Sequence, residues 1–279
     1  IFIFIMKHVL AFCLNSNMFV ALSAFCLYKV SEILFDVQNY QIALFVFFST
    51  LFAYSYMRSS FLSQTIHSSF KIESSHINHG LLLLFSALVS ISIAILLGLK
   101  FIQLLFLPIV ISTLYPLSFT INNITFSLRD VPFLKIFIIA FVWSYVTLLL
   151  PALYLGVEIN YFLISTFVQR FLFILAISIP FDIRDFEIDR MRTIPNTIGV
   201  ENSKFFAWFC LILLDLLLIV DLVYNDITTP FFIAIFCSIE LCALCIYFTN
   251  LERSRVFYSF FVEGLSIIMY LFVLIALMF

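Results

Sequence analysis

The chain has 279 residues, of which 64% are hydrophobic and only 11% charged, and its formal net charge is −2. Soluble domains are typically ~45–50% apolar and ~25% charged, so a soluble fold could not cover this much apolar surface. The absence of a basic tract argues against binding to nucleic acid, and nothing in the sequence indicates an obligate protein partner. The composition therefore predicts an all-α integral membrane protein, surrounded by the lipid bilayer.

Apolar stretches long enough to span a membrane as helices recur along the whole chain. Each needs about 20 mostly apolar residues. The third and fourth are separated only by Gly98, Leu99 and Lys100, which predicts a tight helical hairpin, with one broken helix as the alternative. The first stretch contains Ala21-Leu22-Ser23, so a cleaved signal peptide is its alternative interpretation. We expect one domain over residues 1–279 with nine spans, near 8–28, 40–57, 80–98, 101–118, 134–154, 160–181, 205–224, 229–248 and 257–278.

Positive charges lie almost entirely on one side of this predicted topology. With nine spans, the amino terminus and the even-numbered loops share a side, and the opposite side carries only Lys29 and Lys100. Because cytoplasmic loops carry an excess of lysine and arginine, we expect the amino terminus to be cytoplasmic and the carboxyl terminus to lie outside. The basic residues on the predicted cytoplasmic side are Lys7, Arg58, Lys71, Arg129, Lys135, Arg184, Arg190, Arg192, Lys204, Arg253 and Arg255.

An acidic cluster follows the sixth predicted span directly. Asp182, Asp185 and Asp189 have helical spacing that predicts a single shared face, with Asp182 nearest the membrane. Like charges arranged in this way require a cation between them, and oxygen ligands of this kind suit Mg²⁺, so we expect these three residues to be its ligands. A solvated loop of mixed charges is the alternative. Three arginines alternate with or follow these acids, and they favour a site that also binds an anion: Arg184, Arg190 and Arg192.

The pattern Asp182-x-x-Asp185-x-x-x-Asp189-Arg190, followed by Arg-Thr-Ile-Pro-x-x-x-Gly, resembles the second aspartate-rich motif of the UbiA superfamily of intramembrane prenyltransferases. That family has nine transmembrane helices and carries this motif after the sixth. Two weaker similarities are the segment from Pro132 to Lys135 before the fifth span and the pair Glu263-Gly264 in the ninth. The resemblance implies a UbiA-like bundle with a cavity that opens to the cytoplasm.

The resemblance further implies Mg²⁺-dependent transfer of a prenyl group from a prenyl diphosphate to a hydrophobic acceptor, such as an aromatic or quinone precursor. Asp182, Asp185 and Asp189 would be the catalytic metal ligands. The candidates for contact with the substrate are Arg58, Lys135, Arg184, Arg190, Arg192 and Glu263. The alternatives are a non-catalytic or altered member of the fold that binds an isoprenoid diphosphate, and a membrane transporter.

The sequence departs from the family pattern at the end of the second span. The family normally carries a first acidic motif there, whereas residues 49–58 contain no carboxylate and end at Arg58. One hypothesis is that Arg58 replaces a metal by pairing directly with a phosphate.

Four charged residues fall within predicted spans, where ionised groups are costly and usually face a partner: Arg170, Asp215, Glu240 and Glu263. We expect Glu263 to shape the pocket and Arg170 to pair with Glu240 or Asp215. The alternative for Arg170 is an acceptor-binding role at the base of the cavity.

Overall fold

The structure is a computed structural model that describes residues 17–65, 75–114, 118–121, 124–127, 131, 133–186, 193–254 and 256–279, without the side chains of residues 58–65, 75–79 and both strands. Long helices dominate it, and two of them contain a π-helical segment, labelled η. The elements are α2 (Met18–Leu34), α3 (Tyr40–Thr65), α4 (Ser75–Leu97), α5 (Leu99–Leu114), β1 (Ser118–Ile121), β2 (Ile124–Ser127), α6 (Leu134–Ser144), η2 (Tyr145–Leu149), α7 (Leu150–Leu155), α8 (Tyr161–Arg184), α9 (Ile194–Ile198), α10 (Val200–Val223), α11 (Thr229–Tyr247), η3 (Phe257–Val262) and α12 (Glu263–Ala276).

The prediction of an all-helical, multi-span membrane protein is confirmed. Among the described residues, seven helical runs are long and apolar enough to cross a membrane. The fifth predicted span, 134–154, corresponds to the continuous run of α6, η2 and α7. Of the two remaining predicted spans, one corresponds to α5, which is apolar but has only 16 residues, and the other to α2, which has 17.

Several boundaries differ from the prediction; α3, for example, continues to Thr65 instead of ending at residue 57. The first predicted span ended at residue 28, but α2 continues to Leu34, while residues 8–16 lie outside the described part of the chain. Within this extension, Lys29 pairs with the buried Glu32 one turn later. The fourth predicted span ended at residue 118, but α5 ends at Leu114 and Ser118 already belongs to β1.

The third and fourth spans form the predicted hairpin. Gly98 between them has φ of 88°, a left-handed conformation that suits glycine and ends α4. Tyr154 on α7 connects the turn to the rest of the bundle, because its hydroxyl donates a hydrogen bond to the Leu97 carbonyl at 2.9 Å. Its own carbonyl accepts from Lys100 Nζ, also at 2.9 Å.

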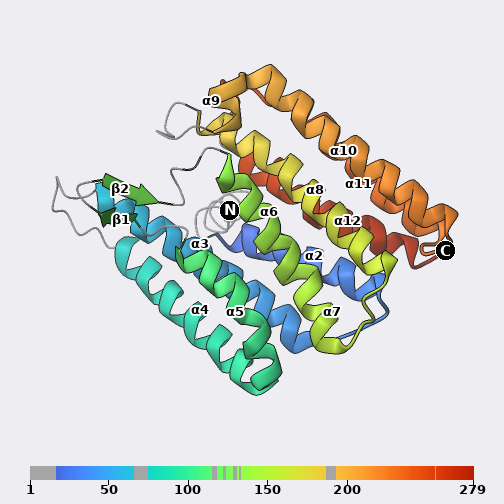
Figure 1. The fold of residues 1–279 in the computed structure, drawn as a ribbon, viewed down its shortest axis with the longest axis horizontal. Coiled ribbons are helices and arrows are strands. Elements are labelled where there is room, and N and C mark those ends of the chain that lie inside the picture. Colours follow the sequence, from blue (N-terminus) through green and yellow to red (C-terminus); the bar gives the residue numbers. More distant parts are fainter. Residues whose placement is uncertain are drawn as a thin grey trace, which may run out of the picture.

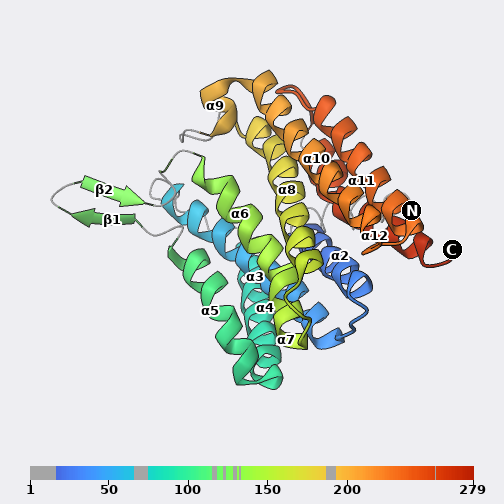
Figure 2. The same cartoon turned by 45° about the vertical axis from the view of Figure 1, so that its right-hand side comes forward.

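A two-stranded antiparallel ribbon extends from one end of the bundle, and the sequence analysis missed it. Its register pairs Ser118 with Ser127 and Ile121 with Ile124. Figure 1 shows this ribbon at the same end of the molecule as α9 and the start of α6, whereas the α4–α5 turn lies at the opposite end. The turned view keeps this arrangement (Figure 2).

Helix α8 runs through the centre of the bundle. It is the most buried of the candidate spans, with 67% of an 18-residue stretch inside the protein. It packs against α6 on one side and α10 on the other (Figure 2), and Phe173, Ile179 and Ile183 belong to the largest apolar core. The end of α8 is therefore held at a defined position, among the ends of several neighbouring helices.

Candidate active site

The candidate site is built on the last turn of α8. The helix starts at an Asn160 cap, whose side chain accepts from the Leu163 amide at 2.9 Å, and it ends at Arg184 with Asp185 as its C-cap. The carboxyl end of a helix carries partial negative charge, so acidic side chains are unfavourable there unless cations accompany them. The structure supplies one cation for each of the two described aspartates.

Lys135 on α6 pairs with Asp182 on α8. The lysine Nζ lies 2.9 Å from Asp182 Oδ1, and the two side chains are 26% and 3% exposed. A carboxylate this buried needs such a partner, because burial of an isolated charge is costly. Lys135 reaches it from the first turn of α6, directly after Phe133, whose φ of 66° is unusual for a non-glycine residue. The pair fixes the amino end of α6 to the carboxyl end of α8.

Arg184 and Asp185 form the second pair. Arg184 Nε donates to Asp185 Oδ1 at 2.8 Å, and Nη2 donates to Oδ2 at 2.7 Å. The guanidinium carbon also lies 5.2 Å from the centre of the Phe181 ring. Both partners are about 30% exposed, so an incoming ligand can reach this pair. Bidentate arginine geometry suits phosphate as well as carboxylate oxygens.

Glu263 approaches the same region from the last span. It is the first residue of α12, directly after the π-helix η3, and it interacts electrostatically with Arg184. Segments of π-helix are rare and are frequent at functional sites. The backbone carbonyl of Glu263 accepts a hydrogen bond from Ser23 on α2 at 2.7 Å. At the adjacent Gly264, an added Cβ would make only an ordinary van der Waals contact with the Phe19 ring, at 3.7 Å.

Two aromatic residues complete the described wall of the site, and the sequence analysis had not named them. Trp143 Nε1 on α6 donates to the Tyr54 hydroxyl on α3 at 3.1 Å. Tyr54 also interacts electrostatically with Glu263 and Lys135, so it belongs to the same cluster. Aromatic residues are so frequent in this chain that no sequence signal distinguishes these two.

No protein-family model and no curated protein sequence matches the chain. One solved structure does match over almost the full length, that of a digeranylgeranylglyceryl phosphate synthase, which is a UbiA-family prenyltransferase. The TM-score is 0.55 at 17% sequence identity, and the match covers 94% of this chain and 93% of the other. The chain has the UbiA-type fold.

The UbiA-type fold brings together residues that are far apart in the sequence. One end of the bundle holds five charged residues of the predicted site: Lys135, Asp182, Arg184, Asp185 and Glu263. The predicted helical face through three aspartates is wrong in one respect, because α8 ends before Asp185. The remaining residues of the predicted site, Asp189, Arg190 and Arg192, lie outside the described residues, and so does the side chain of Arg58.

The described carboxylates fit the donor set for Mg²⁺ only in part. Among the described residues, no group of three or more potential ligand side chains could hold a metal ion. Asp182 and Asp185 are of the right type, and Mg²⁺ is commonly bound by one or two carboxylates together with phosphate oxygens of a substrate. Each of the two is paired with a cation here, so metal binding requires Lys135 and Arg184 to give up these partners.

The expected pairing of Arg170 with Glu240 or Asp215 is wrong. The guanidinium donates instead to the Leu27 carbonyl at 2.7 Å, and to the hydroxyls of Ser31 at 3.1 Å and Thr147 at 3.3 Å. Glu240 is exposed on α11, so it lies away from the buried Arg170. Arg170 instead turns towards α2, and its three acceptors are all uncharged.

Proposed function

We propose that this protein transfers a prenyl group from a prenyl diphosphate to a hydrophobic acceptor within the membrane, in a reaction that depends on Mg²⁺. The observation that carries the proposal is the pair of carboxylate–cation contacts, Asp182 with Lys135 and Asp185 with Arg184, at one end of a UbiA-type bundle. The synthase with the similar fold is named for an isoprenoid lipid product, which supports the same class of substrate. An aromatic or quinone precursor is the class of acceptor that we expect.

The two ion pairs are suited to exchange partners when a diphosphate binds. Lys135 and Arg184 would then turn from the aspartates to phosphate oxygens, which leaves Asp182 and Asp185 available to hold Mg²⁺. The exchange keeps every charge in the half-buried site compensated. Bound Mg²⁺ supplies electrostatic stabilisation of the leaving diphosphate. Asp189, Arg190 and Arg192 follow in the sequence, and we propose that they complete the site.

Transfer proceeds by cleavage of the bond between the allylic carbon and the diphosphate oxygen. The bonding electrons leave with the diphosphate, which Lys135 and Arg184 stabilise, and the acceptor attacks the allylic cation and then loses a proton. Aromatic faces attract cations, and Tyr54 and Trp143 lie beside the charged cluster. The apolar bundle excludes water that would otherwise quench the cation.

The positive charges of the chain support a cytoplasmic site. The amino end of α6 and the carboxyl end of α8 carry Lys135 and Arg184, on the side that holds most of the basic residues. We therefore propose that the site opens to the cytoplasm and that the carboxyl terminus lies outside.

The main test is release of diphosphate by the purified protein in detergent. Prenyl diphosphates of increasing chain length are supplied with candidate acceptors, in the presence of Mg²⁺ or of EDTA. We expect release in Mg²⁺ that EDTA abolishes and that added Mg²⁺ restores. Detergent micelles hold no gradient, so turnover in them contradicts a purely transporting role. Binding of prenyl diphosphates without turnover would instead establish the non-catalytic alternative, which the lack of any carboxylate in α3 favours.

Arg58 provides a separate prediction about the missing first acidic motif. If Arg58 pairs with a phosphate in place of a metal, Arg58→Gln should remove a charge-assisted hydrogen bond worth roughly 1.5–3 kcal/mol. The KM for the prenyl diphosphate should then rise by about 10- to 100-fold. Steady-state kinetics measure this, with Lys100→Gln at the opposite end of the bundle as a matched control. An unchanged KM would remove Arg58 from the site.

A further inference from the structure

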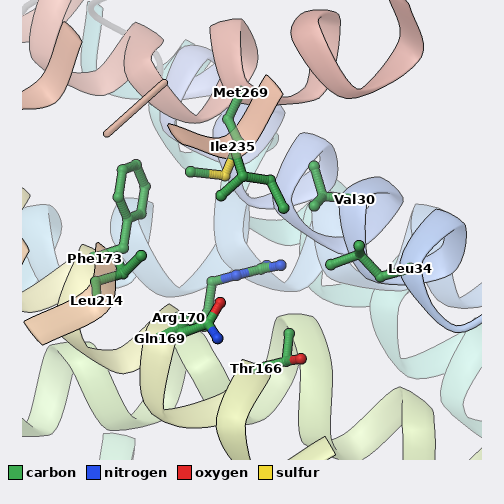
Figure 3. A pocket seen from close by; sticks show the side chains of 9 residues that line it. All are labelled: Val30, Leu34, Thr166, Gln169, Arg170, Phe173, Leu214, Ile235 and Met269. Carbon is green, nitrogen blue, oxygen red and sulfur yellow. The ribbon is translucent and has the colours of Figure 1, made fainter. Parts of the chain in front are cut away.

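A small cavity lies beside Arg170, in the middle of the bundle. It measures about 30 Å³ and is lined by side chains from α2, α8, α10, α11 and α12. Figure 3 shows the Arg170 side chain reaching into it, with Gln169 and Thr166 on the same helix and Val30, Ile235 and Met269 among the apolar walls. Arg170 lies twelve residues before Asp182, which is about 18 Å along the helix at about 1.5 Å per residue. The cavity is therefore separate from the proposed diphosphate site.

Arg170 is the only charged side chain in the lining, and it is 5% exposed. An arginine side chain has five N–H donors. Three hydrogen bonds use donors of Arg170, and their acceptors are the Leu27 carbonyl and the hydroxyls of Ser31 and Thr147. At least two of its N–H groups therefore have no acceptor among the described residues. The positive charge also has no carboxylate partner there.

The other two polar side chains of the cavity already have partners. Gln169 Nε2 donates to Asp221 Oδ2 at 2.5 Å and to the Ser165 hydroxyl at 3.0 Å. The Thr166 hydroxyl donates to the Phe162 carbonyl at 2.8 Å. Two buried carboxylates of these helices have other partners: Asp221 accepts from Ser165 and Gln169, and Glu32 pairs with Lys29 and accepts from the Asn39 amide. Only Arg170 offers unused donors to a molecule in the cavity.

We propose that this cavity is a binding site for one small monovalent anion of the size of chloride, held by the guanidinium of Arg170. A buried cation far from water requires a compensating charge, and Arg170 has none among the described residues. The volume restricts the ligand, because about 10–15 Å³ on this scale holds one water molecule. A space of about 30 Å³ accommodates one halide. The bound anion would link α2 and α8, since the same guanidinium already bonds the α2 backbone.

Bromide in place of chloride gives the direct test in the unaltered protein. Crystals grown in sodium bromide should show an anomalous scattering peak within hydrogen-bonding distance of the Arg170 guanidinium. Absence of a peak there, with a water molecule or apolar side chains filling the space, would overturn the proposal.

Thermal unfolding in detergent provides the second test. At constant ionic strength, replacement of sodium gluconate by sodium chloride should raise the Tm saturably by about 3 °C, because the anion binds only the folded state. Arg170→Gln should remove this rise, whereas Arg253→Gln, which deletes an exposed arginine, should retain it. Equal Tm values in the two salts for the unaltered protein, or an undiminished rise in Arg170→Gln, would contradict the site. Neither result depends on prenyl transfer.

Discussion

Asp185→Asn is expected to reduce Mg²⁺-dependent release of diphosphate by about 10²-fold or more. Asp185 is one of two described carboxylates at the end of α8, and its partner Arg184 is the more accessible cation of the site. The amide keeps the size of the side chain and can still accept a hydrogen bond from Arg184, but it is a poor ligand for Mg²⁺. Initial rates at saturating prenyl diphosphate and a series of Mg²⁺ concentrations measure the effect.

The folded state should tolerate this change. Because both partners are about 30% exposed, loss of the ion pair should cost about 1 kcal/mol or less of unfolding free energy. Asp226→Asn is a matched control, since Asp226 is exposed in the turn between α10 and α11. Equal rates for the unaltered protein and Asp185→Asn would remove Asp185 from the metal site.

Lys135→Met is expected to destabilise the protein more than any other single change at the site. It leaves Asp182, which is 3% exposed, without its lysine partner. Removal of one member of a buried pair costs about 3–5 kcal/mol, and the lower end applies here because Lys135 is 26% exposed. Unfolding in a denaturant series, followed by tryptophan fluorescence, measures the loss. The KM for the prenyl diphosphate should rise as well, because Lys135 is also a proposed phosphate contact.

A second substitution separates the two effects of Lys135. Asp182→Asn removes the carboxylate charge that has lost its lysine partner, so Lys135→Met combined with Asp182→Asn should recover more than half of the lost stability while activity stays low. If the double variant is as unstable as Lys135→Met alone, the ion pair is not what holds α6 against α8. Lys135→Arg should retain most of the stability, since the charge is preserved.

Several features of the site were predictable because they depend on local spacing. The group Asp182, Arg184 and Asp185 directly follows an apolar stretch, and that pattern alone indicated a charged site at the end of a span. The hairpin at Gly98 was predictable for a similar reason, since only three residues separate two apolar stretches, although one broken helix was the alternative. The ribbon of β1 and β2 was missed, although β-branched and aromatic residues flank Asn122-Asn123, because its signal is short and weak.

The sequence by itself determined that this protein spans a membrane many times and carries clustered charges beside its sixth span, since hydropathy and helical spacing are local properties. Only the tertiary structure decided which charges meet. Lys135 and Asp182 are 47 residues apart in the sequence. Arg170 donates to the Leu27 carbonyl, 143 residues away, instead of pairing with Glu240 or Asp215 as the sequence suggested. Such pairings depend on how helices rotate and pack against one another, and packing is a collective property of the whole bundle that no single segment encodes.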